Sequence, residues 1–124
     1  MIRISSWNRQ GEIQTDLTLA DCQQKLKARR SFLWMDIYDE TSENSYSIMQ
    51  DIFELHPLAI EDALEETHVP KIDDWGEYLS LVTIVIEPKE MLVDQTLTQE
   101  LDIFIGKNYI LTYHPQNSGT VNLI

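Results

Sequence analysis

The sequence predicts an α/β domain, an α/β/α sandwich with a central mixed parallel and antiparallel sheet. The helical patterns lie in the first half of the chain, and candidate strands lie on both sides of them. The second half contains a strongly apolar run, Tyr78–Ile86, followed by two runs that read as a hairpin. With 124 residues, the chain has the length of one domain and can bury a core without disulfides or a structural metal.

The first two segments, Ile2–Trp7 and Glu12–Thr15, are separated by an Asn-Arg-Gln-Gly turn and read as a short hairpin or as two successive strands. A helix then starts after Thr18, and Asp21 three residues later approximates a capping box. Cys22 falls on the narrow apolar stripe of this helix and is predicted to be a core residue. As the single cysteine, it has no partner for an internal bridge, which agrees with a reducing compartment.

The next strand is predicted at Phe32–Tyr38, which is apolar on both faces apart from Asp36. Asp36 is either a ligand or a polar group facing a turn. A second helix follows, capped by Thr41 or Ser42, with apolar residues at helical spacing up to Leu55.

A third helix is predicted directly after a His-Pro corner. Pro57 suits the first helical position, and His56 before it is biased out of the α region, which favours an N-cap role. Four acids of this helix fall within an arc of about 140°: Glu61, Asp62, Glu65 and Glu66. Like charges one turn apart are mildly destabilising, so a divalent cation or a basic partner would stabilise this face. A plain solvated surface is the alternative.

The predicted hairpin pairs Leu101–Ile105 with Tyr109–Tyr113 across a Gly-Lys-Asn turn, and the segment Pro88–Thr98 reads as a polar connection. Residues 1–114 therefore form the predicted domain, and residues 115–124 form a loose tail. His68 and His114 follow no zinc-ligand spacing, so neither receives a role.

Composition excludes several function classes. Nine basic residues against twenty-one acidic ones give a net charge of −12, which argues against nucleic acid as a partner. The sequence contains neither a signal-peptide h-region nor an apolar window long enough for a membrane span, so a soluble, cytosolic chain is expected. Glycine-rich phosphate loops and hydrolase motifs are also absent from the sequence, and we predict that the protein is not an enzyme.

The stretch HPLAIEDALEETHVPKIDDWGEY, residues 56–78, resembles the cytosolic N-terminal domain of the CorA family of magnesium transporters. The resemblance is specific over about two dozen residues and rests on His56, Pro57, Leu58, Glu61, Asp62, Leu64, Pro70, Lys71, Ile72 and Tyr78. The order of elements on either side is compatible with it. Within this motif His56, Pro57, Pro70 and Lys71 are interpreted as structural residues.

The resemblance implies a regulatory domain on the cytoplasmic face of the cell membrane. Family members continue into a stalk helix and two membrane helices with a Gly-Met-Asn signature, and five subunits form a homopentamer around the ion path. They hold regulatory Mg²⁺ between neighbouring subunits, which favours the closed state. When the motif is carried over to this sequence, the resemblance implies Glu61 and Asp62 as the ligands of this Mg²⁺. Glu65 and Glu66 are candidates for acids that surround these ligands without binding the ion directly.

The sequence ends about where the stalk would begin, so we expect an excised domain that associates only weakly by itself. Any membrane attachment would come through helices absent from this chain. A domain of a ZntB-like zinc transporter and a free-standing acidic interaction module stay open as alternatives. The residues leave the transported ion undecided among Mg²⁺, Co²⁺, Ni²⁺ and Zn²⁺.

Overall fold

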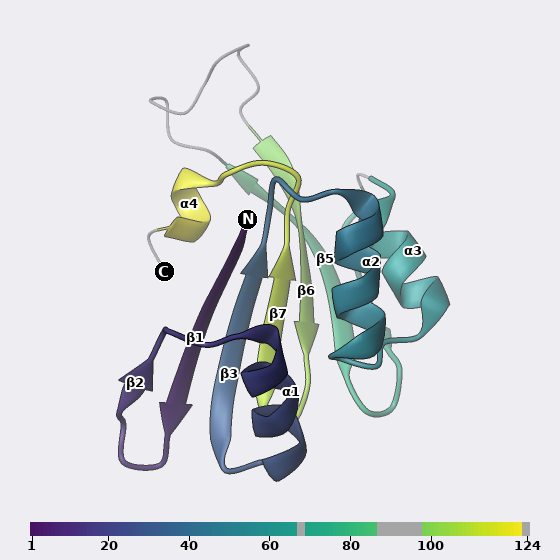
Figure 1. Cartoon of the computed structure of the whole chain (residues 1–124). Helices are drawn as coiled ribbons and strands as arrows, with labels where there is room; N and C mark the ends of the chain where they lie inside the picture. Colours follow the sequence, from purple (N-terminus) through teal and green to yellow (C-terminus); the bar gives the residue numbers. More distant parts are fainter. Residues whose placement is uncertain (67–68, 87–97, 123–124) are drawn as a thin grey trace.

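The computed structural model describes residues 1–66, 69–86 and 98–122, whose seven strands form one mixed sheet (Figure 1). Along the sheet the strand order is β2-β1-β3-β7-β6-β5-β4. β3 and β7 run parallel, and every other described neighbouring pair is antiparallel. The strands are β1 (Ile2–Asn8), β2 (Ile13–Gln14), β3 (Ser31–Ile37), β4 (Lys71–Asp74), β5 (Leu79–Ile86), β6 (Thr98–Ile105) and β7 (Tyr109–Tyr113).

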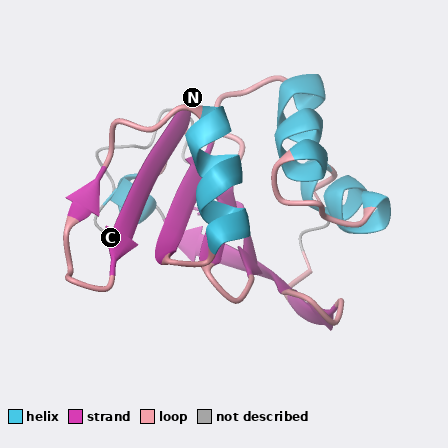
Figure 2. Cartoon of the chain, turned by 60° about the horizontal axis from the view of Figure 1, so that its bottom comes forward, coloured by secondary structure: helices cyan, strands magenta, loops and turns pink. Residues whose placement is uncertain are grey.

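Helices lie on both faces of this sheet, which confirms the predicted sandwich. Three of them pack on one face: α1 (Leu19–Ala28), α2 (Ser42–Asp51) and α3 (Pro57–Leu64). The short helix α4 (Gly119–Asn122) lies on the opposite face, behind β1 and β3 when α1 is in front (Figure 2). The described helices lack the length and apolar character needed to cross a bilayer.

Local sequence signals explain where the helices begin. The Thr18 side chain accepts from the Asp21 backbone N–H at 3.1 Å, and the Asp21 side chain accepts from the Thr18 backbone N–H at 3.0 Å. This is the predicted capping box, and Cys22 behind it is fully buried as expected. Thr41 is the N-cap of α2, and its side chain accepts from the Asn44 backbone N–H at 3.1 Å.

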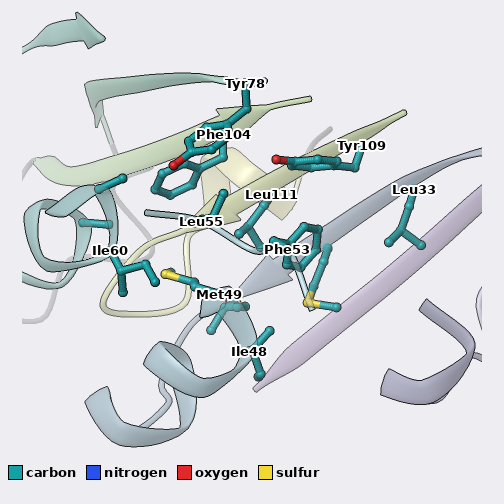
Figure 3. Close-up of a cluster of buried hydrophobic side chains, with 14 of the residues drawn as sticks. Leu33, Ile48, Met49, Phe53, Leu55, Ile60, Tyr78, Phe104, Tyr109 and Leu111 are labelled. Atoms are coloured by element: carbon teal, nitrogen blue, oxygen red, sulfur yellow. The ribbon is translucent and has the colours of Figure 1, made fainter. Parts of the chain in front are cut away.

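The core lies between the sheet and α1–α3 (Figure 3). Alternate strand residues such as Leu33, Phe104 and Leu111 point towards the helices, each at most 1% exposed. Met49 of α2 and Ile60 of α3 meet them from the other side and are completely buried. α3 is therefore held against the sheet by its apolar side, which fixes the position of its acidic side.

Two segments differ from the sequence-based expectation, and a third lies almost entirely outside the described residues. β4 was not predicted, because four residues with two acids carry little strand signal. The predicted loose tail contains α4, whose Val121 is 2% exposed. The predicted connection Pro88–Thr98 lies outside the described residues, except for Thr98, which begins β6.

Candidate divalent-cation site

The candidate site is built on the corner between α2 and α3. His56 is the N-cap of α3, as predicted, and its Nδ1 accepts from the Leu58 backbone N–H at 3.1 Å. Its own backbone N–H donates to the Tyr78 hydroxyl at 2.8 Å, and its ring stacks on Trp75 with centroids 5.3 Å apart. Pro57 occupies the first helical position. The corner that places α3 is thus tied to the turn between β4 and β5.

The helix is shorter than the acidic pattern predicted, and this corrects the expectation that all four acids share one helical face. α3 ends at Leu64, and Glu65 is already extended, with φ −95° and ψ 125°. Pro70 disfavours helical conformation at Val69, and β4 begins at Lys71, so the helix cannot continue up to the strand. Glu61 and Asp62 lie on the helix, whereas Glu65 and Glu66 follow it and do not share its face.

Lys71 provides a positive charge for this acidic surface. Its Nζ lies 3.0 Å from Asp62 Oδ2 and 3.5 Å from Asp73 Oδ2. The hydrogen bond to Asp62 raises the pKa of the Lys71 ammonium. Both side chains of the Lys71–Asp62 pair are part exposed, at 37% and 46%, so water screens the interaction. Glu61, next to this pair, is exposed.

Two further acids lie beneath this surface on β6 and were missed by the sequence analysis. Glu100 and Asp102 are 5% and 4% exposed and face the helices. Burial, followed by the charge of Glu100 and a hydrogen bond with it, raises the pKa of Asp102 to about 8, and the charge of Asp62 contributes. Their spacing could have revealed them, because residues two apart on a strand share a face, and Glu100 and Asp102 share the face of the apolar Phe104.

The oxygen donors present suit a hard divalent cation such as Mg²⁺, which takes one or two carboxylates and keeps several waters. Glu61 and Asp62 supply such carboxylates at an accessible surface. Across the described residues, no three His, Cys, Asp or Glu side chains are grouped so as to hold a metal ion. The described chain therefore offers a partial ligand set.

A second polar cluster lies on the other face of the sheet, formed by residues of β1, β3 and β7 and by His114. Asp36 accepts from His114 Nε2 at 2.8 Å, from the Thr112 hydroxyl at 2.7 Å and from Arg3 at 2.8 Å. Burial opposes ionisation of Asp36, but these hydrogen bonds outweigh it and hold the pKa of its carboxyl below the usual value. Asp36 is therefore a partnered structural carboxylate among the described residues. His114, to which the sequence analysis gave no role, is completely buried beside it.

Comparison with known proteins identifies the family. The family model described as CorA-like Mg²⁺ transporter protein matches residues 29–124, more than half of the chain. The chain belongs to this family. The motif-based recognition is thereby confirmed, and it extends well beyond the motif itself.

Individual relatives agree with this assignment. The chain is 33% identical over 84 residues to YfjQ of Bacillus subtilis (strain 168), whose name describes a metal ion transporter. That match covers 68% of this chain and 24% of YfjQ, so the chain corresponds to about a quarter of that relative's length.

Solved structures share the fold of this CorA-like chain. The complete CorA magnesium transporter of Methanocaldococcus jannaschii superimposes with a TM-score of 0.68 at 16% identity, over 99% of this chain and 35% of that protein. The soluble domain of the same transporter gives 0.65 at 17% identity, over 97% of this chain and 43% of that domain. The full-length CmaX protein gives 0.68 at 15% identity, over 97% of this chain and 36% of CmaX. These likenesses confirm the predicted fold class.

Proposed function

We propose that this chain is the cytosolic, divalent-cation-sensing domain of a CorA-like metal ion transporter. In the proposal, Mg²⁺ binds between neighbouring subunits of a homopentamer at Glu61 and Asp62 and favours the closed state. The family assignment supports transport, and the family description supports Mg²⁺ as the ion. The sensing role rests on the chemistry of the acidic surface around α3.

The observation that carries the proposal is the ion pair between Asp62 and Lys71. This partly exposed carboxylate lies next to Glu61 and forms an ion pair with a lysine of the same chain. A lysine ammonium neutralises one unit of charge, whereas Mg²⁺ brings two, so Mg²⁺ can compete for the same carboxylate when it is abundant. Few carboxylates and several retained waters give weak binding, which suits sensing of an abundant ion.

The ion would act by screening repulsion between subunits. Each copy of the chain carries a net charge of −12, so opposed acidic surfaces repel one another unless cations lie between them. Two unit charges 4 Å apart repel by about 4 kcal/mol at an effective dielectric constant near 20. Loss of several such ions would bias the assembly towards an open state, which gives negative feedback on uptake.

Limited proteolysis of the full-length transporter in membranes tests this proposal. Mg²⁺ is expected to protect the protein from cleavage, and the Glu61→Gln/Asp62→Asn variant should need a higher Mg²⁺ concentration for the same protection. Glu43→Gln is a matched control, because Glu43 is an exposed acid in the first turn of α2. Equal protection of the double variant and the control would contradict the proposal.

A further inference from the structure

A cleft of about 680 Å³ opens on the helix-covered face, away from the acidic surface of α3. It lies where the end of α1, the α2–α3 corner and the turns at the ends of β4–β5 and β6–β7 meet. This volume falls within the roughly 300–1,000 Å³ typical of small-molecule sites. The proposed sensing role does not use this cleft.

The inner surface of the cleft is aromatic. Phe53 and Tyr109 contact each other with ring centroids 5.0 Å apart, and both are at least nine-tenths buried. On one side the rings of His56, Trp75 and Tyr78 form a continuous stack, with centroid separations of 5.3 Å and 6.2 Å. Trp75 is half-buried and His56 is exposed, so this stack reaches the opening. Such a surface favours a ligand with a flat ring.

The cationic side of the cleft comes from two other elements. Lys27 and Arg29 lie at the end of α1, and Lys107 lies in the turn between β6 and β7. None of the three forms an ion pair with another described residue. Compensation of the α1 dipole explains basic residues on that helix, but it does not explain Lys107. In a chain with a net charge of −12, three unpaired cations against two acids, Glu54 and Glu77, in the lining of one cleft favour an anionic ligand.

The walls of the cleft are held in place by hydrogen bonds between elements. Gln23 of α1 donates to the Asp51 carbonyl of α2 at 3.3 Å, and Asn108 donates to the Leu26 carbonyl at 3.1 Å. Among the described residues, three that are not glycine have positive φ, and two of them, Arg29 and Glu54, also line the cleft, with φ of 55° and 54°. Residues other than glycine are uncommon at positive φ, because glycine adopts this backbone conformation at a lower energetic cost.

We propose that the cleft binds a nucleotide. The phosphates contact Lys27, Arg29 and Lys107, where unpaired ammonium and guanidinium groups are available. The base lies against the exposed edge of the His56 and Trp75 stack. Glu54 and Glu77, which line the cleft from the α2 end and the β4–β5 turn, can accept hydrogen bonds from the ribose hydroxyls.

Titration of the chain with ADP, followed by tryptophan fluorescence in buffer containing EDTA, tests this proposal. EDTA removes divalent cations, so the result does not depend on the proposed sensing site. We expect saturable quenching, because Trp75 lines the cleft. Lys27→Gln and Lys107→Gln should each weaken ADP binding roughly five- to tenfold, as expected for loss of one charge-assisted contact.

Two variants separate binding from folding. Arg29→Gly removes the charge and relieves the positive φ, so it should raise the melting temperature while weakening ADP binding. Arg30→Gln is the matched control, because it makes the same charge change at the neighbouring residue, outside the cleft lining, and it should leave binding unchanged.

Three results would overturn the nucleotide assignment. The first is an absence of saturable ADP binding, and the second is equal weakening by Arg30→Gln and Lys107→Gln. The third is equal affinity for pyrophosphate and ADP, which would show that the aromatic surface contributes nothing. Binding of ADP that exceeds both pyrophosphate and adenosine would support it.

Discussion

Lys71 Nζ of β4 lies 3.0 Å from Asp62 Oδ2 of α3. The Pro-Lys and Glu-Asp parts of the family-like motif are therefore in direct contact in the folded chain. The sequence interpretation made Lys71 a structural residue. In the folded chain it also forms an ion pair with Asp62, one of the two proposed ligands of the cation. If the proposed cation binds at Asp62, it has to compete with Lys71 for this carboxylate.

Removal of this competitor should strengthen divalent binding. We expect Lys71→Gln to raise the Mg²⁺ affinity of the chain by up to about fivefold, because an exposed ion pair is worth at most about 1 kcal/mol. The free energy of unfolding should fall by no more than the same amount. Calorimetric titration and urea unfolding measure the two effects, with Lys25→Gln as a control on α1. Unchanged or weaker Mg²⁺ binding would show that Lys71 does not compete.

Divalent binding by the chain itself should be weak. We expect a Kd for Mg²⁺ of roughly 10⁻⁴ to 10⁻³ M, the range of few-ligand oxygen sites, since the described residues supply only part of a ligand set. Calorimetry with Mg²⁺ and Zn²⁺ checks this. Micromolar Zn²⁺ binding together with weak Mg²⁺ binding would favour a ZntB-like zinc transporter instead.

The Asp36 cluster should contribute stability that disappears in acid. The pKa of Asp36 is lowered in the folded state, so its contribution is complete above the ordinary value of 3.8 and is lost as the pH falls through the lower folded value. Asp36→Asn should cost about 3 kcal/mol or more near neutral pH, because it leaves Arg3 and His114 without their carboxylate.

Urea unfolding of wild type and Asp36→Asn between pH 2 and pH 7 measures this effect. The difference in unfolding free energy between them should shrink as the pH falls. A difference that stays constant over this range would mean that ionisation of Asp36 does not contribute to stability.

Asp102 should have the opposite pH dependence. Its folded pKa of about 8 lies above the ordinary value of 3.8, so the folded state retains a proton that the unfolded chain has lost. Stability should therefore fall as the pH rises from about 4 to about 8. Asp102→Asn replaces the acid by a neutral side chain and should be more stable than wild type at pH 8, by on the order of a few kcal/mol. Equal melting temperatures at pH 5 and at pH 8 would contradict the buried, protonated state.

The sequence predicted the parts of the fold that depend on local signals. The Thr18–Asp21 capping box, the His56–Pro57 corner and the β6–β7 hairpin are fixed by residues close together in the chain, and all three are found as predicted. β4 was missed because its strand character comes from pairing with β5, a tertiary effect that four partly acidic residues do not reveal.

The candidate site was only partly predictable for the same reason. Glu61 and Asp62 were found because they belong to one motif on one helix. The positions of Glu65 and Glu66 depend on where α3 ends, which the approach to β4 decides. The contacts of Asp36 with His114 span 78 residues, and the approach of Asp102 to Asp62 depends on how α3 packs on β6. No local pattern records such contacts.

The proposed role of Glu61 and Asp62 is to sense cytosolic Mg²⁺. Uptake by the full-length transporter in vesicles preloaded with increasing internal Mg²⁺ measures this role. We expect internal Mg²⁺ to inhibit uptake by wild type and by the Glu43→Gln control, whereas Glu61→Gln/Asp62→Asn should lose most of this inhibition while still transporting. If the double variant transports and retains wild-type inhibition by internal Mg²⁺, the acidic surface of α3 is not the sensor.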